Sequence, residues 1–360
     1  MEPLPINTIS IEGWRSMKNV EVTLGKINIL IGGNGSGKSS FLSAFELLNA
    51  IGNNNLQRYI EINGGANQNF HYGTKKTAEI KIAIKFSKKS YLCNIIPGNN
   101  DDVLIGNTAF GTKHSEKLRY ETGEEPASDY LKDAEQYYSL DPLKQEISNS
   151  LASLIIYHFQ DTGNTSPLKR VSDIYQTRYL HPDGANLAAF LYEIKKNYPK
   201  NYESIVTAIR FAFPDFKDFI FQKTGENVRL LWNDRYAEHY DFPLSALSDG
   251  TLRFIALSTL LLQPNPQKFI IIDEPELGLH PEAIGILAEL IKLASANSQL
   301  LISTQSVQLV DCFTPDDILI AEKDNGETQI TRPDTEELKD WLKDYTLGEI
   351  WRKNIMGGNP

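Results

Sequence analysis

The sequence predicts an α/β fold: a mainly parallel sheet flanked by helices, with an antiparallel β lobe and a helical insertion. Three observations predict it. Two short apolar runs, residues 26–31 and 268–274, are typical of buried strands. Strand and helix patterns alternate through the second half of the chain, which is typical of a parallel sheet. Residues 78–86 alternate apolar and polar side chains, which indicates a half-buried strand.

The first half of the chain predicts a β lobe built around one helix. Residues 6–22 predict an opening pair of strands, and residues 41–51 carry apolar side chains at helical spacing. Residues 52–77 are rich in Asn and Gly and predict a loop. Weaker strand patterns extend the antiparallel lobe, at residues 91–95, 103–105 and 118–120. Residues 123–150 are charged and predict helix.

The second half of the chain predicts the alternating part of the fold. The predicted strands are residues 154–160, 219–222, 227–232, 268–274, 300–303, 317–321 and 328–331. The predicted helices are residues 186–196, 202–211, 252–262, 281–296 and 335–345. We therefore divide the chain into an N-terminal β lobe (1–122), a helical insertion and lid region (123–246) and a C-terminal lobe (247–360).

Composition narrows the class of protein. The hydrophobic content of 41% and charged content of 23% are ordinary for a soluble globular protein. No apolar run approaches the roughly 20 residues that span a bilayer, and the N-terminus lacks the pattern of a secretory signal. Cys93 and Cys312 lie far apart, which predicts a reducing, cytoplasmic location. The net charge of −10 argues against wholesale coating of nucleic acid but does not exclude a local basic groove.

A phosphate-binding motif follows the first buried strand. The segment after residue 31 fits the P-loop pattern G-x-x-x-x-G-K-[ST], and a helix pattern follows it. Glycines let such a loop aim its N–H groups at phosphate oxygens, and the helix N-terminus adds a positive field. The predicted nucleotide contacts are Gly33, Asn34, Gly35, Ser36, Gly37, Lys38, Ser39 and Ser40. Lys38 would reach the β- and γ-phosphates of ATP, and Ser39 would bind Mg²⁺.

A pair of carboxylates ends the second buried strand. Residues 270–272 are Ile-Ile-Ile, and Asp273 and Glu274 follow, which is a Walker B pattern. Two adjacent carboxylates at the end of an apolar strand are costly unless a metal or hydrogen bonds occupy them. We predict that Asp273 helps to hold Mg²⁺ and that Glu274 polarises the attacking water.

These motifs, with four others in the same order along the chain, resemble the RecF- and SMC-like ABC-type ATPases. Leu247-Ser248-Asp249-Gly250 resembles the ABC signature, and Gly13-Trp14-Arg15-Ser16-Met17 resembles the opening of the RecF- and SMC-like members. Residues 276–281, Glu-Leu-Gly-Leu-His-Pro, are similar to the D-loop of RecF-like and OLD-like ATPases. Residues 303–306, Ser-Thr-Gln-Ser, occupy the switch position. The chain most resembles the compact stand-alone RecF-like predicted ATPases of bacteria, which are related to the OLD-family ATPase head.

The resemblance implies an ABC-type head with a composite site. Gln160 would sit in the Q-loop beside Mg²⁺, and Ser248 and Gly250 would reach the ATP of a second protomer. Gln160 is equally well interpreted as a surface glutamine, and Arg15 as either a phosphate or dimer contact or a solvated charge. Gln305 stands where ABC-type sites usually have His, which suggests γ-phosphate sensing with slow turnover because glutamine cannot titrate.

The predicted function is ATP-driven dimerisation that acts as a switch, in phage defence or DNA processing. The expected partners are a second copy of the chain, or a higher oligomer, and a separate effector such as a nuclease encoded nearby, with DNA as a further partner and no membrane. About thirty residues follow Thr331, and their acidic side chains are spaced like the polar face of a helix. The alternatives are a RecF-type DNA-repair clamp and an ABC transporter ATPase subunit.

Overall fold

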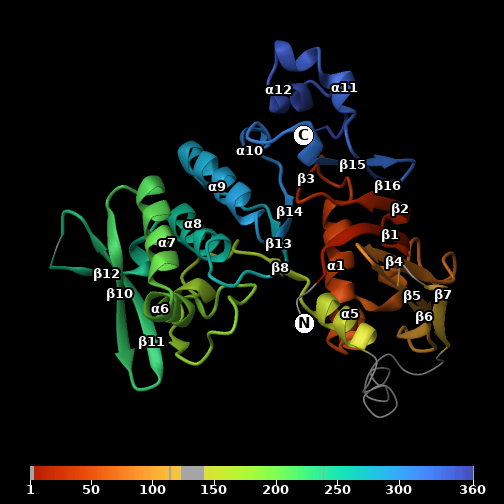
Figure 1. Cartoon of the computed structure of the whole chain (residues 1–360), viewed down its shortest axis with the longest axis horizontal. Coiled ribbons are helices and arrows are strands. Elements are labelled where there is room, and N and C mark those ends of the chain that lie inside the picture. Colours follow the sequence, from red (N-terminus) through yellow and green to blue (C-terminus); the bar gives the residue numbers. More distant parts are fainter. Residues whose placement is uncertain (1–3, 113–114, 123–141, 238, 360) are drawn as a thin grey trace. The chain divides into compact units, whose positions relative to one another are not determined.

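Three β-sheets and the helices around them make up the described part of the chain (Figure 1). The computed structural model describes residues 4–112, 115–122, 142–237 and 239–359, with the backbone alone for 115–122. Contacts divide the chain into two compact units. The first comprises Met1–Ile156, Gln267–Ile271 and Pro315–Pro360, and the second Tyr157–Pro266 and Ile272–Thr314.

The predicted antiparallel lobe is confirmed as a six-stranded sheet in the first unit, with the order β2-β1-β4-β5-β6-β7. Its strands pair antiparallel throughout. Apolar and polar residues alternate along the strand of residues 80–86, so one face of that strand is buried. Ile80, Ile82 and Ile84 are fully buried, and the residues between them are not. The bounds are β1 (Ile6–Trp14), β2 (Met17–Thr23), β4 (Ile80–Phe86), β5 (Lys89–Pro97), β6 (Val103–Thr112) and β7 (Ser115–Thr122).

The predicted strand, glycine loop and helix are present in the first unit as β3 (Ile27–Ile31) and α1 (Lys38–Gly52). Strand β3 pairs in parallel with β15 (Ile318–Asp324), which pairs antiparallel with β16 (Glu327–Thr331). The indole N–H of Trp14 donates to the hydroxyl of Ser43 at 3.0 Å, which ties the end of β1 to α1. These contacts fix the helix that follows the P-loop.

The prediction of a loop over residues 52–77 is wrong. The segment contains α2 (Leu56–Ile62) and α3 (Gly65–Asn69). Leu56 and Ile60 are buried one helical turn apart, and this packing outweighs the low helix propensity of the neighbouring Asn residues. The Asn and Gly residues lie at the helix ends, where Gly64 has a φ of 90°.

Two predicted helices differ from the structure. The helix predicted over 123–150 is present from Pro142 as α5 (Pro142–Ala152), and residues 123–141 lie outside the described residues. The continuous helix predicted over 335–345 is wrong. It is divided into α11 (Thr335–Leu338) and a 3-10 turn (Trp341–Lys343), because Trp341 and Leu342 stay exposed and give a longer helix no buried face. Helix α12 (Leu347–Arg352) follows.

In the second unit, four helices pack together beside a small antiparallel sheet. They are α6 (Leu187–Asn197), α7 (Pro199–Ala212), α8 (Asp249–Leu261) and α9 (Pro281–Ala294). The sheet contains β9 (Ser172–Asp173), β10 (Phe216–Thr224), β11 (Asn227–Asp234) and β12 (Asp241–Pro243). The strands β14 (Gln299–Ser303), β13 (Phe269–Asp273) and β8 (Ile155–Tyr157) are consecutive in strand order and are not part of this small sheet.

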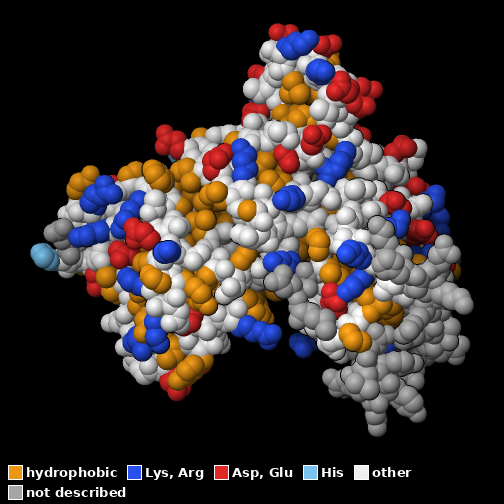
Figure 2. All heavy atoms as spheres, viewed as in Figure 1, with side chains coloured by type: hydrophobic (Ala, Val, Ile, Leu, Met, Phe, Trp, Pro, Cys, Tyr) orange, Lys and Arg blue, Asp and Glu red, His pale blue; other side chains and the backbone are white. Residues whose placement is uncertain are grey.

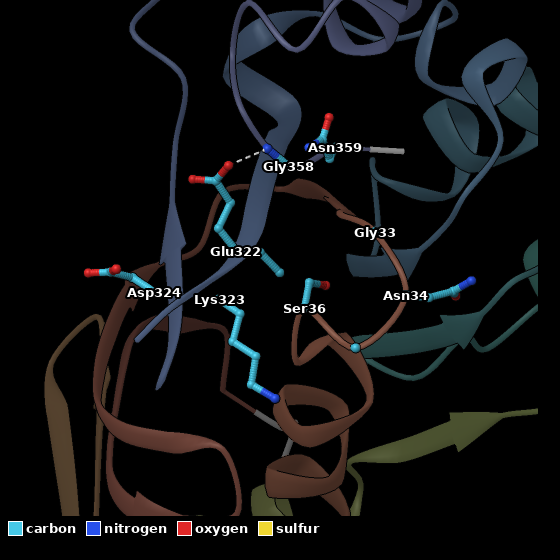
Figure 3. A pocket seen from close by; sticks show the side chains of 10 residues that line it. Gly33, Asn34, Ser36, Glu322, Lys323, Asp324, Gly358 and Asn359 are labelled. Atoms are coloured by element: carbon cyan, nitrogen blue, oxygen red, sulfur yellow. Dashed lines mark hydrogen bonds between the residues drawn. The ribbon is translucent and has the colours of Figure 1, made fainter. Parts of the chain in front are cut away.

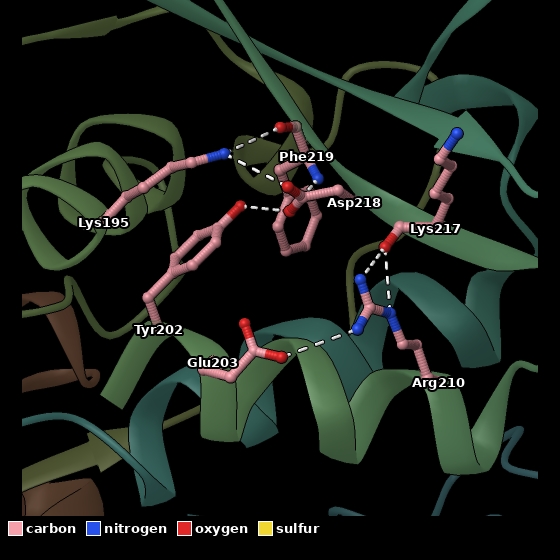
Figure 4. A network of polar contacts seen from close by, with 7 residues as sticks. All are labelled: Lys195, Tyr202, Glu203, Arg210, Lys217, Asp218 and Phe219. Atoms are coloured by element: carbon pink, nitrogen blue, oxygen red, sulfur yellow. Dashed lines mark hydrogen bonds and ion pairs between the residues drawn. The ribbon is translucent and has the colours of Figure 1, made fainter. Parts of the chain in front are cut away.

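A polar network joins the helices of the second unit to its small sheet (Figure 4). The Tyr202 hydroxyl donates to Asp218 at 2.6 Å, and Lys195 donates to the other oxygen of Asp218 at 3.3 Å. Burial, with the carboxylate of Asp218 beside it, raises the pKa of Tyr202. The phenol therefore stays protonated and serves as a fixed donor between α7 and β10.

Among the helices of the described chain, we find none that combines the length and the apolar character needed to cross a bilayer.

Candidate functional site

The P-loop has the backbone of an anion cradle. Gly35 and Gly37 have φ values of 77° and 107°, a region that favours glycine. Gly37 is the N-cap of α1, and no side chain caps that helix. The first-turn N–H groups of α1 therefore open directly into the loop, where a phosphate can accept from them.

Lys38 places the positive charge of the site inside this loop. Its side chain is buried, and its ammonium donates to the carbonyl oxygens of Gly32 at 2.5 Å and Gly33 at 3.0 Å. Ser39 is exposed beside it on the first turn of α1. A buried ammonium, first-turn N–H groups and a nearby hydroxyl are the donor set that a nucleotide phosphate with Mg²⁺ requires, so the residues present fit this group.

Strand β16 supports the loop from behind. The hydroxyl of Thr328, which is fully buried, lies 3.1 Å from the Ser36 carbonyl oxygen and 2.8 Å from the Ser16 hydroxyl. A Cβ atom placed on Gly37 would lie 2.0 Å from the Thr328 hydroxyl, so only glycine fits there. Thr328 therefore links the loop to the turn between β1 and β2, a contact that no motif indicates.

Arg15 lies in that same turn and makes contacts within the first unit. Its guanidinium donates to the side chains of Asn69 and Asn63, each at 3.1 Å. It also lies 5.1 Å from the centre of the Trp14 ring. These contacts hold Arg15 against the segment of α2 and α3, and its predicted role toward phosphate or a second copy stays a prediction.

In the second unit, the two Walker B carboxylates lie at the end of β13. Glu274 adopts a φ of 47°, which is uncommon for a residue with a side chain, and its N–H donates to the Ser303 carbonyl oxygen at 2.9 Å. The Gln305 side-chain amide donates to the Glu274 carboxylate at 2.5 Å. The structure thus brings Glu274 and Gln305, two of the three predicted catalytic residues (the third is Lys38), into direct contact, with Glu274 held at one carboxylate oxygen.

A half-buried glutamate, Glu276, holds the segment that carries Gln305. Its Oε1 atom accepts from the Thr304 hydroxyl at 2.6 Å and from the Gln305 N–H at 3.1 Å. Its Oε2 atom is buried and has no hydrogen-bond partner. Burial raises the pKa of Glu276 above its ordinary value, against the lowering effect of these hydrogen bonds. The D-loop resemblance covers Glu276 but does not indicate this support of Gln305.

Asp273 faces a histidine to which the motifs assign no role. His158 Nδ1 lies 3.8 Å from the Asp273 carboxylate, and the His158 side chain is 43% exposed. Gln160, two residues later, is exposed, and its backbone carbonyl accepts from Arg253 at 3.1 Å. Only the folded structure reveals that His158 lies near Asp273, because more than a hundred residues separate them in sequence.

The signature segment begins helix α8. Ser248 is exposed and caps the helix, since its hydroxyl accepts from the Thr251 N–H at 3.1 Å. A Cβ atom placed on Gly250 would lie 2.2 Å from the Gly278 carbonyl oxygen, so glycine allows the signature and D-loop segments to touch. Arg253, buried on α8, donates to the Phe159 carbonyl at 2.9 Å. The signature, D-loop and Gln160 segments are therefore joined.

Comparisons with known proteins agree with these motifs. A family model described as "AAA domain, putative AbiEii toxin, Type IV TA system" matches residues 27–311. No curated protein matches the chain significantly.

Solved structures of SMC heads share the fold. The SMC head bound to the C-winged helix domain of ScpA is 16% identical with a TM-score of 0.56, covering 93% of this chain and 99% of that chain. An SMC head domain with an extended coiled coil, bound to the C-terminal domain of ScpA from Pyrococcus furiosus, is 15% identical with a TM-score of 0.52. This match covers 94% of our chain and 98% of that chain. The likeness confirms the predicted SMC-like, ABC-type head fold.

The raised pKa of Glu276 predicts a pH-dependent stability. The folded state binds the Glu276 proton more tightly than the unfolded state, so this contribution to stability is lost as pH rises from about 4.5 through the raised pKa. Glu276→Gln keeps an acceptor and cannot titrate. We expect its free energy of unfolding, relative to the parent, to increase with pH when measured by urea denaturation.

Two further variants complete this measurement. Glu276→Ala removes the acceptor for Thr304 and Gln305 and should lower stability at every pH, by about 1–3 kcal/mol. Glu289→Gln, at a side chain 67% exposed on α9, should leave the pH profile unchanged. Parallel pH profiles for the parent and Glu276→Gln would contradict the prediction.

Proposed function

The chain belongs to the AAA domain family that its residues 27–311 match, and we propose that this ATPase works as an ATP-driven switch. Members of this class bind and hydrolyse ATP, which is the established part of the function. The observation that carries the proposal is the contact between Gln305 and Glu274 at 2.5 Å. It joins a residue suited to sensing the γ-phosphate to the carboxylate suited to orienting water, so the state of the nucleotide can be transmitted through the segment of residues 303–306.

We assign a nucleotide-binding role to the motif residues of each unit. In the first unit, Lys38 and the N–H groups of the loop would bind the β- and γ-phosphates, and the Ser39 hydroxyl would bind Mg²⁺. In the second unit, the carboxylate of Asp273 would serve as a ligand of Mg²⁺. When bound, Mg²⁺ neutralises charge on the phosphate oxygens. Glu274 accepts a hydrogen bond from the attacking water, and Gln305 keeps its carboxylate in place. Because glutamine does not titrate, Gln305 orients groups without moving a proton.

We further propose that ATP joins two copies of the chain. Ser248 and Gly250 lie at the N-terminus of α8, a helix of 13 residues whose end favours an anion. The Ser248 hydroxyl already satisfies one N–H of its own helix and remains exposed. A phosphate of a nucleotide held by the partner copy is the anion that this arrangement fits, which makes Ser248 and Gly250 part of the partner's site.

The chemistry of defence or DNA processing would then lie in a second protein. The acidic residues after Thr331 are dispersed: Asp340 is 88% exposed and pairs with Lys343 at 2.6 Å. Figure 2 shows acidic and basic side chains side by side around the C-terminal helices. Carboxylates that are spread among lysines do not resemble the grouped ligands of a nuclease metal centre. We therefore propose a separate effector, such as a nuclease, which the ATPase controls by preferring it in one nucleotide state.

Glu274→Gln tests the assignment of the water-orienting carboxylate. The amide keeps the shape of the side chain and removes the negative charge that orients water, so ATP should still bind while turnover falls about 100-fold. Steady-state phosphate release and nucleotide affinity measure the two effects separately. The matched control, Glu289→Gln, should hydrolyse ATP normally, and parent-like turnover of Glu274→Gln would remove Glu274 from this role.

Mixed variants test the site shared between two copies. Ser248→Arg and Lys38→Ala should each abolish hydrolysis alone, whereas a mixture should regain activity because each heterodimer contains one intact site. Ser245→Arg introduces the same side chain at an exposed position three residues earlier and should remain active. Normal hydrolysis by both single variants would contradict the proposal of a site shared between two copies.

Assays of the purified chain test whether the effector is separate. With Mg²⁺ or Mn²⁺ we expect no cleavage of single- or double-stranded DNA or RNA, because the carboxylates after Thr331 are dispersed. Cleavage that survives purification and is abolished by Asp340→Ala or Asp344→Ala would place the nuclease in this chain and refute the proposal.

A further inference from the structure

The C-terminal strap, residues 357–359, packs against the P-loop. A Cβ atom placed on Gly33 would lie 2.5 Å from the Asn359 carbonyl oxygen, and one placed on Gly358 would lie 3.7 Å from the Gly32 Cα. Backbone therefore meets backbone at the first two residues of the loop, with no room for side chains. Both segments belong to the first unit.

Two side chains fix the strap in this position. Glu322, on β15, accepts from the Gly358 N–H at 2.6 Å, and the Trp351 indole donates to the Gly358 carbonyl at 2.9 Å. Trp351 is fully buried, so its position is set by packing. Gly358 has a φ of 76°, and a Cβ atom there would lie 2.7 Å from Ile320 Cγ2. Only glycine satisfies both the backbone conformation and the space.

A pocket of about 540 Å³ lies next to these contacts (Figure 3). It is lined by P-loop residues 33–36, by the end of β15 from Ala321 to Asp324, and by Gly358 and Asn359. The loop is therefore not packed against a continuous core on this side. The buried Ser36 hydroxyl, which lines the pocket, has no hydrogen-bond partner. The strap consequently restrains the P-loop at a place where the loop otherwise borders the open pocket.

We propose that the C-terminal strap holds the P-loop in its nucleotide-binding shape, with Glu322 and Trp351 as positioning residues. This rests on the proposed function, in that the loop is taken to bind ATP. The strap meets the loop at the backbone of Gly32 and Gly33, whereas Lys38 and the first turn of α1 supply the charge and the N–H groups. The strap therefore supports the cradle, so its release should weaken ATP binding. If the strap instead inhibited binding, its release would strengthen ATP binding.

The strap can be released from two sides without changing the P-loop. Glu322→Ala removes the acceptor for the Gly358 N–H, and Gly358→Ala forces the strap away from Ile320. We expect each to weaken ATP affinity about three- to tenfold and to accelerate amide hydrogen exchange at residues 32–37 in the nucleotide-free protein. Glu322→Gln keeps an acceptor and should restore most of both properties.

Controls separate this effect from unfolding and from failure of the proposed function. Glu336→Ala removes a carboxylate that is 81% exposed and should change neither measurement. Thermal unfolding shows whether the variants are folded. The role of the loop is established if the parent binds ATP and Lys38→Ala does not. If the parent binds ATP and the folded strap variants show equal or tighter binding, or unchanged exchange at residues 32–37, the proposal is wrong.

Discussion

The structure of the first unit depends on a single constraint: a glycine-rich loop must keep its shape although, of its own side chains, only that of Lys38 ties its backbone together. Positive φ values at Gly35 and Gly37 permit this shape but also leave it loose, because glycine retains the most conformational freedom when unfolded. Further restraint comes from outside the motif. Thr328 contacts Ser36 on one side, and the Asn359 carbonyl meets Gly33 on another. The loop is thus packed against residues that lie outside the P-loop motif.

In the second unit, hydrogen bonds hold two neighbouring carboxylates, those of Glu274 and Glu276, around the segment that carries Gln305. Glu276 is half-buried and is held by Thr304 and the Gln305 N–H, while Glu274 is held by the Gln305 side chain. Gln305 therefore donates two hydrogen bonds to carboxylates, from its backbone N–H to Glu276 and from its side-chain amide to Glu274. Under the proposed function, a change at Gln305 that follows the nucleotide state would reach Glu274 through their hydrogen bond. A chain of two hydrogen bonds is a short path for such coupling.

Local patterns predicted much of this fold because they depend on neighbouring residues. The β3 strand, the glycine loop and α1 follow from sequence alone, and so do the alternating strands of the lobe. Helices α2 and α3 were not predictable from composition, since two buried side chains, Leu56 and Ile60, outweigh many Asn and Gly residues. The contacts of Thr328 with Ser36 and of His158 with Asp273 join distant residues, so only the folded chain reveals them.

The strap also determines when, during translation, the contacts around the P-loop can be completed. Translation produces Gly33 early and Thr328 and Asn359 late, so the ribosome releases a P-loop long before the residues that restrain it exist. The nascent loop has its full motif but lacks both external contacts. The contacts that surround the P-loop are therefore complete only after residue 359 has emerged, and a chain that ends earlier has the motif without the contact of Asn359 with Gly33. The signature and Walker B segments precede Thr328 in the sequence, so they are translated before these contacts are complete.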